Sequence, residues 1–133
     1  MCIRDSREVY DTKLAEVVAT ADIDLVVLAG WNRLLSNVFL SKNTVINVHP
    51  ALPGSFVGLG AIDRTWAGYK AGELTQGGVM VHYVPDEGVD DGPVICSAAV
   101  PIESRDTKRD FEARMHQTEH RLLVEAIRSV TSE

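Results

Sequence analysis

Cysteine is scarce in this chain: of its 133 residues, only Cys2 and Cys96 carry a thiol. The two lie far apart and lack the short spacing of paired metal ligands, which disfavours both a disulfide framework and a zinc site. Reduced thiols are typical of cytoplasmic proteins, so we expect a cytoplasmic location. No residue pattern implies a metal cofactor.

Long apolar runs and an excess of basic residues are also missing. The longest apolar stretch, IDLVVLAG at residues 23–30, is interrupted by Asp24 and is far shorter than the roughly 20 residues of a membrane span. The net charge of −6 disfavours a nucleic-acid partner, because such proteins concentrate lysine and arginine on one face. We therefore expect small-molecule substrates, with neither a membrane nor a nucleic acid as partner.

The residues that are present suit a single globular domain, since 45% are hydrophobic and 24% are charged. Apolar side chains at helical spacing predict an amphipathic helix over residues 7–20, and an aliphatic run predicts a buried parallel strand over residues 23–29. Further strands are predicted at residues 44–48, 77–84 and 94–100, with a helix after the second and a long helix after the last. This alternation predicts an α/β fold with an open, mostly parallel sheet flanked by helices.

Two hydrogen-bonding side chains, Asn47 and His49, stand at the end of the second predicted strand, just before a loop rich in proline and glycine. Side chains two apart on a strand point to the same side, and open α/β sheets bind ligands beyond the carboxyl ends of their strands. An amide can stabilise a developing oxyanion and an imidazole can carry a proton near neutral pH, so the pair suits acyl transfer. Spacing alone leaves open the simpler alternative of a polar loop start.

A histidine in this role requires a carboxylate to fix its tautomer. The loop after the third predicted strand offers Asp86, Glu87, Asp90 and Asp91. A loop of this composition is usually only a solvated turn. Glu119 lies along the apolar stripe of the last predicted helix, where an unpaired carboxylate is costly, so its partner is either a substrate or an ordinary salt bridge. His82, inside a predicted strand, is interpreted as a structural residue.

Three stretches carry a resemblance to a known family: NVHPALPGSFVGLGAI, GGVMVHYVPDEGVDDGPVI and QTEH. The chain resembles the phosphoribosylglycinamide formyltransferases, which move a formyl group from 10-formyltetrahydrofolate to the amine of glycinamide ribonucleotide in de novo purine biosynthesis. The resemblance implies a Rossmann-like formyltransferase domain over residues 7–133, with residues 1–6 unassigned. It implies catalytic roles for Asn47, His49 and Asp90, and a substrate contact at Glu119. It also implies cofactor contacts at Arg33, Leu34, Leu35, Asn47, Asp86, Glu87 and Asp90.

The sequence departs from this family in three places. One leucine is missing before the proline in HPALPGSF, and Gly60 stands where many members carry a histidine. Family members also begin with a strand and a glycine-rich turn that binds the substrate phosphate, which this chain does not show. We therefore expect an N-terminally truncated domain, in which the strand at residues 23–29 leaves an unpaired edge through which copies of the chain could associate.

Related activities remain as alternatives. Formyltetrahydrofolate deformylase resembles this family and uses water in place of the amine, but its motif tends to carry a second histidine where Pro50 stands here. Methionyl-tRNA formyltransferase is less favoured, because a tRNA partner predicts a basic surface and an additional domain. An inactive fragment that only binds folate is also compatible with the sequence.

Overall fold

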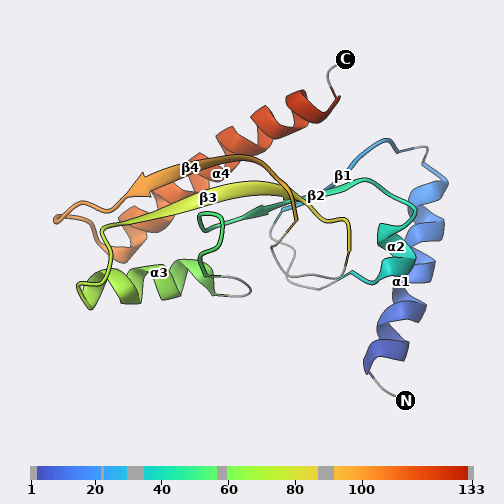
Figure 1. Cartoon of the computed structure of the whole chain (residues 1–133), viewed down its shortest axis with the longest axis horizontal. Helices are drawn as coiled ribbons and strands as arrows, with labels where there is room; N and C mark the ends of the chain where they lie inside the picture. The colour runs from blue at the N-terminus through green and yellow to red at the C-terminus, as the bar shows by residue number, and fades with distance from the viewer. Residues whose placement is uncertain (1–2, 22, 30–34, 57–59, 87–91, 132–133) are drawn as a thin grey trace.

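A computed structural model describes residues 3–21, 23–29, 35–56, 60–86 and 92–131 of the chain. Along these residues the elements follow one another as shown in Figure 1. The helices are α1 (Ile3–Ala19), α2 (Asn37–Leu40), α3 (Ala61–Lys70) and α4 (Lys108–Thr131). The strands are β1 (Val26–Leu28), β2 (Val45–His49), β3 (Gln76–Tyr83) and β4 (Val94–Pro101).

The described strands form one open sheet in the order β1-β2-β3-β4. β1 pairs with β2 in parallel, whereas β3 is antiparallel to both β2 and β4. The predicted α/β fold with an open sheet and flanking helices is confirmed, and each predicted strand is present. Within the described residues, however, the parallel character is restricted to the β1–β2 pair, so the sheet is mixed.

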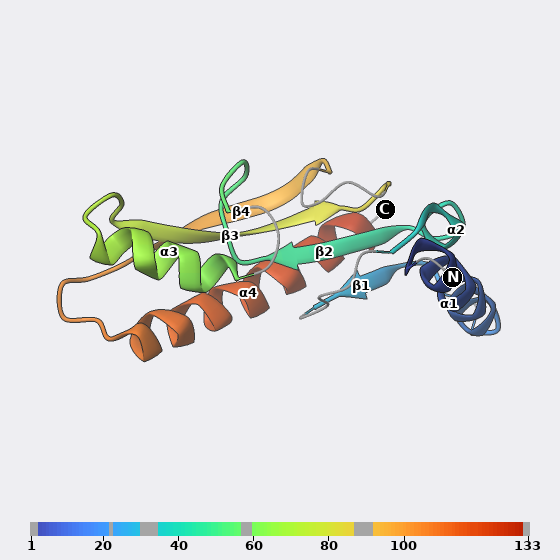
Figure 2. The same ribbon diagram turned by 90° about the horizontal axis from the view of Figure 1, so that it is seen from below.

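The path of the chain explains the antiparallel strands. Figure 2 shows that α3 carries the chain onward in the direction of β2, alongside β3, instead of returning it to the start of β2. β3 therefore runs back past β2. The connection from β3 to β4, residues 84–93, contains no helix in its described part, and connections this short join antiparallel neighbours.

One face of the sheet packs on α4. Ile46 and Val48 of β2 belong to the same buried cluster as Val79 and Val81 of β3. The predicted apolar stripe of the last helix is confirmed, because its members are at most 3% exposed within that cluster: Phe111, Met115, Leu122 and Ala126. This packing fixes which side chains of β2 and β3 turn toward α4 and which turn away.

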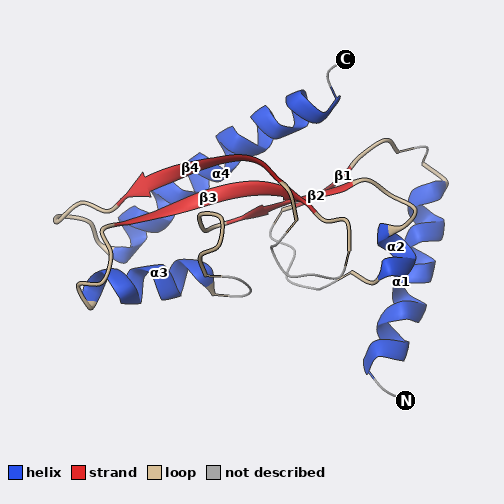
Figure 3. Ribbon diagram, viewed as in Figure 1, coloured by secondary structure: helices blue, strands red, loops and turns tan. Residues whose placement is uncertain are grey.

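α1 and α2 lie together at one end of the molecule, away from α3 and α4 (Figure 3), and the side chains around them form a second buried cluster. Its buried part consists of Ala15 from α1, Leu35, Phe39 and Leu40 from around α2, and Val45 from β2. α1 begins at Ile3, so the helix starts four residues before the one predicted over residues 7–20. The segment Ile3–Ser6 contains no helix-breaking glycine or proline, and the helix continues through it although its apolar periodicity is weak.

The junction between β4 and α4 is held by one ion pair. Arg114 donates to both carboxylate oxygens of Asp106, at 2.7 and 3.0 Å, and to the carbonyl of Pro101 at 2.7 Å. The Arg114 hydrogen bonds, with a further one from the backbone N–H of Glu103, lower the pKa of Asp106 to about 2. A carboxylate whose pKa is depressed by folding stabilises the protein above its unfolded pKa and loses that contribution as the pH falls through the folded value.

We predict that Asp106→Asn reduces the free energy of unfolding more at about pH 6 than at about pH 2.5, because the contribution of the ion pair is complete only above the unfolded pKa near 4 and is partly lost at about pH 2.5. Urea denaturation of variant and parent at both pH values measures the difference. Asp63→Asn is the matched control, because Asp63 is 69% exposed and pairs only with Lys108 among the described residues. If Asp106→Asn lowered the free energy of unfolding by the same amount at the two pH values, the prediction would be contradicted.

Candidate active site

Asn47 and His49 lie on the face of β2 that turns away from α4. Their neighbours Ile46 and Val48 pack into the cluster with α4, and alternate residues of a strand point to opposite faces. His49 is 4% exposed, while Asn47 is half-buried. The structure therefore brings the two candidate side chains to one side of the strand end.

His82 of β3 lies directly beside Asn47 in the sheet register. Its Nε2 atom is 3.4 Å from Nδ2 of Asn47, and its Nδ1 atom is 2.8 Å from the carbonyl oxygen of Tyr83. A carbonyl can only accept, so in the neutral ring Nδ1 carries the proton and Nε2 accepts a hydrogen bond from the Asn47 amide. His82 is buried and hydrogen-bonded, as interpreted from the sequence, but its partner is the candidate oxyanion donor.

The loop after β2 orients His49. The Nε2 atom of His49 is 2.9 Å from the carbonyl oxygen of Phe56, which also accepts a hydrogen bond from Arg64 at 3.1 Å. Phe56 has a φ of 45°, a conformation that is unfavourable for a residue with a side chain and persists only where the surroundings hold it. The strained backbone thus presents its carbonyl to two donors, and in the neutral imidazole it assigns the proton to Nε2.

Two glycines allow neighbouring segments to approach this face of the sheet closely. A Cβ atom at Gly78 would lie 2.3 Å from the side chain of Leu52, in the loop after β2. A Cβ atom at Gly92 would lie 1.9 Å from the carbonyl oxygen of Tyr83, the same carbonyl that fixes the His82 tautomer. The end of β3 and the segment leading into β4 are therefore in contact through Gly92.

The remaining predicted site residues are placed as follows. Asp86 is exposed just after β3, and the side chain of Leu35 is buried in the α1–α2 cluster. Glu119 lies on α4 with 19% of its side chain exposed, and its Oε2 atom is 3.3 Å from Nδ1 of His116 on the same helix. This contact lies within α4 and orients the Glu119 carboxylate. Five of the candidate residues lie outside the described residues: Arg33, Leu34, Glu87, Asp90 and Asp91.

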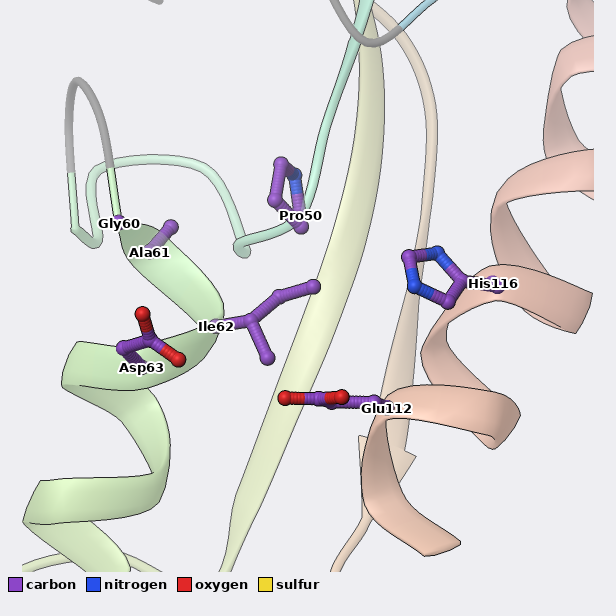
Figure 4. Close-up of a pocket in the computed structure, with 7 residues that line it drawn as sticks. All are labelled: Pro50, Gly60, Ala61, Ile62, Asp63, Glu112 and His116. Carbon is purple, nitrogen blue, oxygen red and sulfur yellow. The ribbon is translucent and has the colours of Figure 1, made fainter. Parts of the chain in front are cut away.

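A cavity of about 330 Å³ lies between the start of α3 and α4, next to the end of β2 (Figure 4). It is lined by Pro50, Gly60, Ala61, Ile62, Asp63, Glu112 and His116. Pro50 follows His49 directly, so the cavity adjoins the strand end from the α4 side, although the described lining does not include Asn47 or His49. Its two carboxylates, Asp63 and Glu112, both pair with Lys108, at 2.6 and 4.0 Å.

Groupings of His, Cys, Asp and Glu that could hold a metal ion are absent from the described part of the chain. No helix within those same residues is both long enough and apolar enough to cross a membrane.

An open sheet flanked by helices, with an amide and an imidazole on one side of a strand end, defines an α/β domain equipped for acyl transfer. The family model of formyl transferases matches residues 3–127. The chain belongs to this family, and the resemblance identified from the sequence motifs is confirmed.

Relatives with the same name in distant organisms are similar over nearly the whole chain. A phosphoribosylglycinamide formyltransferase of Dictyostelium discoideum is 39% identical, with 98% of this chain and 67% of the relative covered. One from Schizosaccharomyces pombe is 40% identical, with 96% and 63% covered. The crystal structure of the Campylobacter jejuni phosphoribosylglycinamide formyltransferase matches with a TM-score of 0.86 at 32% identity, covering 95% of this chain and 63% of the other. The chain thus spans about two thirds of the length of these relatives.

Proposed function

We propose that this chain carries the formyl-transfer site of a phosphoribosylglycinamide formyltransferase. The observation that carries the proposal is the Asn47 amide held by His82 beside His49, at the end of an inner strand. The names of the relatives support formyl transfer over the alternative activities. The co-substrate 10-formyltetrahydrofolate would supply the formyl group, glycinamide ribonucleotide would accept it, and the setting would be purine biosynthesis in the cytoplasm.

Each of the three proposed catalytic residues has a separate role in the reaction. Asn47 donates a hydrogen bond to the formyl oxygen, which becomes negative as the substrate nitrogen bonds to the formyl carbon. His49 takes the proton from that nitrogen and returns it to the folate nitrogen as the old carbon–nitrogen bond breaks. Asp90, proposed on the resemblance alone, orients His49 and stabilises the charge that the imidazole gains when it takes the proton.

The described residues also constrain how folate would be held. The side chain of Leu35 is packed against α1, at 4% exposure, so this residue can offer a ligand only its backbone. Proposed folate contacts from the same segment and from the loop after β3 are Arg33, Leu34, Leu35, Asp86, Glu87 and Asp90. For the substrate amine we propose Glu119, whose carboxylate is oriented by His116.

A direct assay tests the proposal. The chain is incubated with 10-formyltetrahydrofolate, with and without glycinamide ribonucleotide, and release of tetrahydrofolate is followed. Release that depends on the ribonucleotide supports formyl transfer, whereas equal release without it indicates the deformylase reaction. Folate binding without any release indicates a binding fragment. Release that is independent of the ribonucleotide, or binding without release, would reject the proposed activity.

His82 allows a further prediction about Asn47. We expect His82→Phe to lower kcat about three- to tenfold, because it removes one hydrogen-bond acceptor that orients the Asn47 amide while keeping a ring in the buried position. His82→Gln keeps an acceptor and should recover part of the loss. Steady-state kinetics of both variants measure the effect, and a parent-like kcat in His82→Phe would show that the contact does not orient the amide.

A further inference from the structure

Asp11 is a completely buried acidic residue that the proposed chemistry does not use. It lies on α1 with 0% of its surface exposed, and its Oδ2 atom accepts a hydrogen bond from the backbone N–H of Ser36 at 2.5 Å. Burying a carboxyl group is costly unless hydrogen bonds compensate for lost hydration. The two residues are 25 positions apart, so this bond ties α1 to the start of α2.

The start of α2 depends on this contact because it has little support of its own. α2 spans only Asn37–Leu40, and its N-cap residue, Ser36, makes no side-chain capping hydrogen bond. The Ser36 hydroxyl is buried without a partner among the described residues. A helix of one turn is unstable in isolation, so the Asp11 carboxyl group and the surrounding apolar cluster fix where Leu35 and Ser36 lie.

Leu35 connects this contact to the proposed folate site. Its side chain packs with Ala15 and Phe39 in the α1–α2 cluster, on the side of the segment where Asp11 also lies. Only its backbone is therefore left to contact a ligand. A shift of the Ser36 N–H would move the backbone of Leu35 with it, since the two are joined by one rigid peptide unit.

We propose that Asp11 is a positioning residue for folate: it holds the backbone of Leu35 and Ser36 in the binding conformation without touching the ligand. This inference rests on the proposed function, because Leu35 enters the folate site only through it. It predicts an effect on folate affinity that the nucleotide substrate does not share.

Three variants of the full chain test the proposal. Asp11→Ala removes the acceptor, Asp11→Asn keeps one carboxamide oxygen in its place, and Glu16→Gln changes an exposed acidic residue of the same helix. We expect Asp11→Ala to weaken binding of a stable 10-formyl folate analogue about tenfold, and Asp11→Asn, whose carboxamide oxygen is a weaker acceptor, about threefold, while Glu16→Gln binds like the parent. The KM for the formyl donor should rise in parallel, with kcat and the KM for glycinamide ribonucleotide changed less than twofold.

The readouts separate positioning from general destabilisation. Circular dichroism melting shows whether Asp11→Ala is folded, and if it is not, Asp11→Asn alone decides the outcome. A folded Asp11→Asn with parent affinity for the folate analogue would overturn the inference, as would equal losses for folate and ribonucleotide. A parent chain that binds no folate would instead overturn the proposed function, and this inference with it.

Discussion

Replacing Asn47 by alanine is expected to lower kcat for formyl transfer about 100- to 1,000-fold, the usual effect of removing one oxyanion donor. The amide is held beside His82 at the strand end, so its hydrogen bond to the developing oxyanion requires no reorganisation. Because that bond strengthens only in the transition state, the KM for the formyl donor should change little. Single-turnover kinetics at saturating folate would measure the loss.

Asn43→Ala is the matched control for this substitution. Asn43 precedes β2 and donates from Nδ2 to the carbonyl oxygen of Phe39 at 3.1 Å, away from the strand end. Its loss should reduce stability by about 1 kcal/mol and leave kcat unchanged. If Asn47→Ala retained parent activity, or if Asn43→Ala lost as much, the assignment of the oxyanion donor would be wrong.

The second large effect is expected at Gly92, where alanine should lower kcat/KM about 100-fold, the effect of displacing a catalytic group by about 1 Å. The added Cβ would lie 1.9 Å from the Tyr83 carbonyl oxygen, so one of the two segments must move. The same carbonyl accepts from Nδ1 of His82, and the N–H of Tyr83 donates to the carbonyl of Pro93 at 2.9 Å. The disturbance therefore displaces the backbone at the end of β3, which lies beside Asn47 in the sheet, and this is a larger change than the loss of the His82 hydrogen bond alone.

Gly72→Ala distinguishes this steric effect from the ordinary cost of replacing a glycine. Gly72 has a φ of +77° but open space around the position of a Cβ atom. We expect Gly72→Ala to lose about 1 to 2 kcal/mol of stability, because alanine is unfavourable in a left-handed backbone conformation. Its kcat/KM should be unchanged. Thermal melting and steady-state kinetics of both variants provide the comparison, and parent-like kinetics in Gly92→Ala would show that the contact is not required.

Much of the fold follows from local sequence patterns. The buried stripe of α4 and the positions of all four described strands agree with the periodicity of apolar residues. The direction of β3 does not follow from that pattern, because a helix between two strands suggested a parallel crossover. Instead, α3 runs onward beside β3. This path depends on the packing of α3 against the sheet and α4, where the ring centroids of Trp66 and Phe111 are 6.0 Å apart.

The sequence by itself determined where the strands and the last helix lie and that Asn47 and His49 share one side of a strand, since both follow from the fixed repeats of the backbone. Only the tertiary structure decided which partners those residues meet. The pairing of Asn47 with His82 joins residues 35 positions apart, and that of Ser36 with Asp11 joins residues 25 positions apart. Such contacts depend on strand register and on helix packing, and no local pattern of residues encodes either.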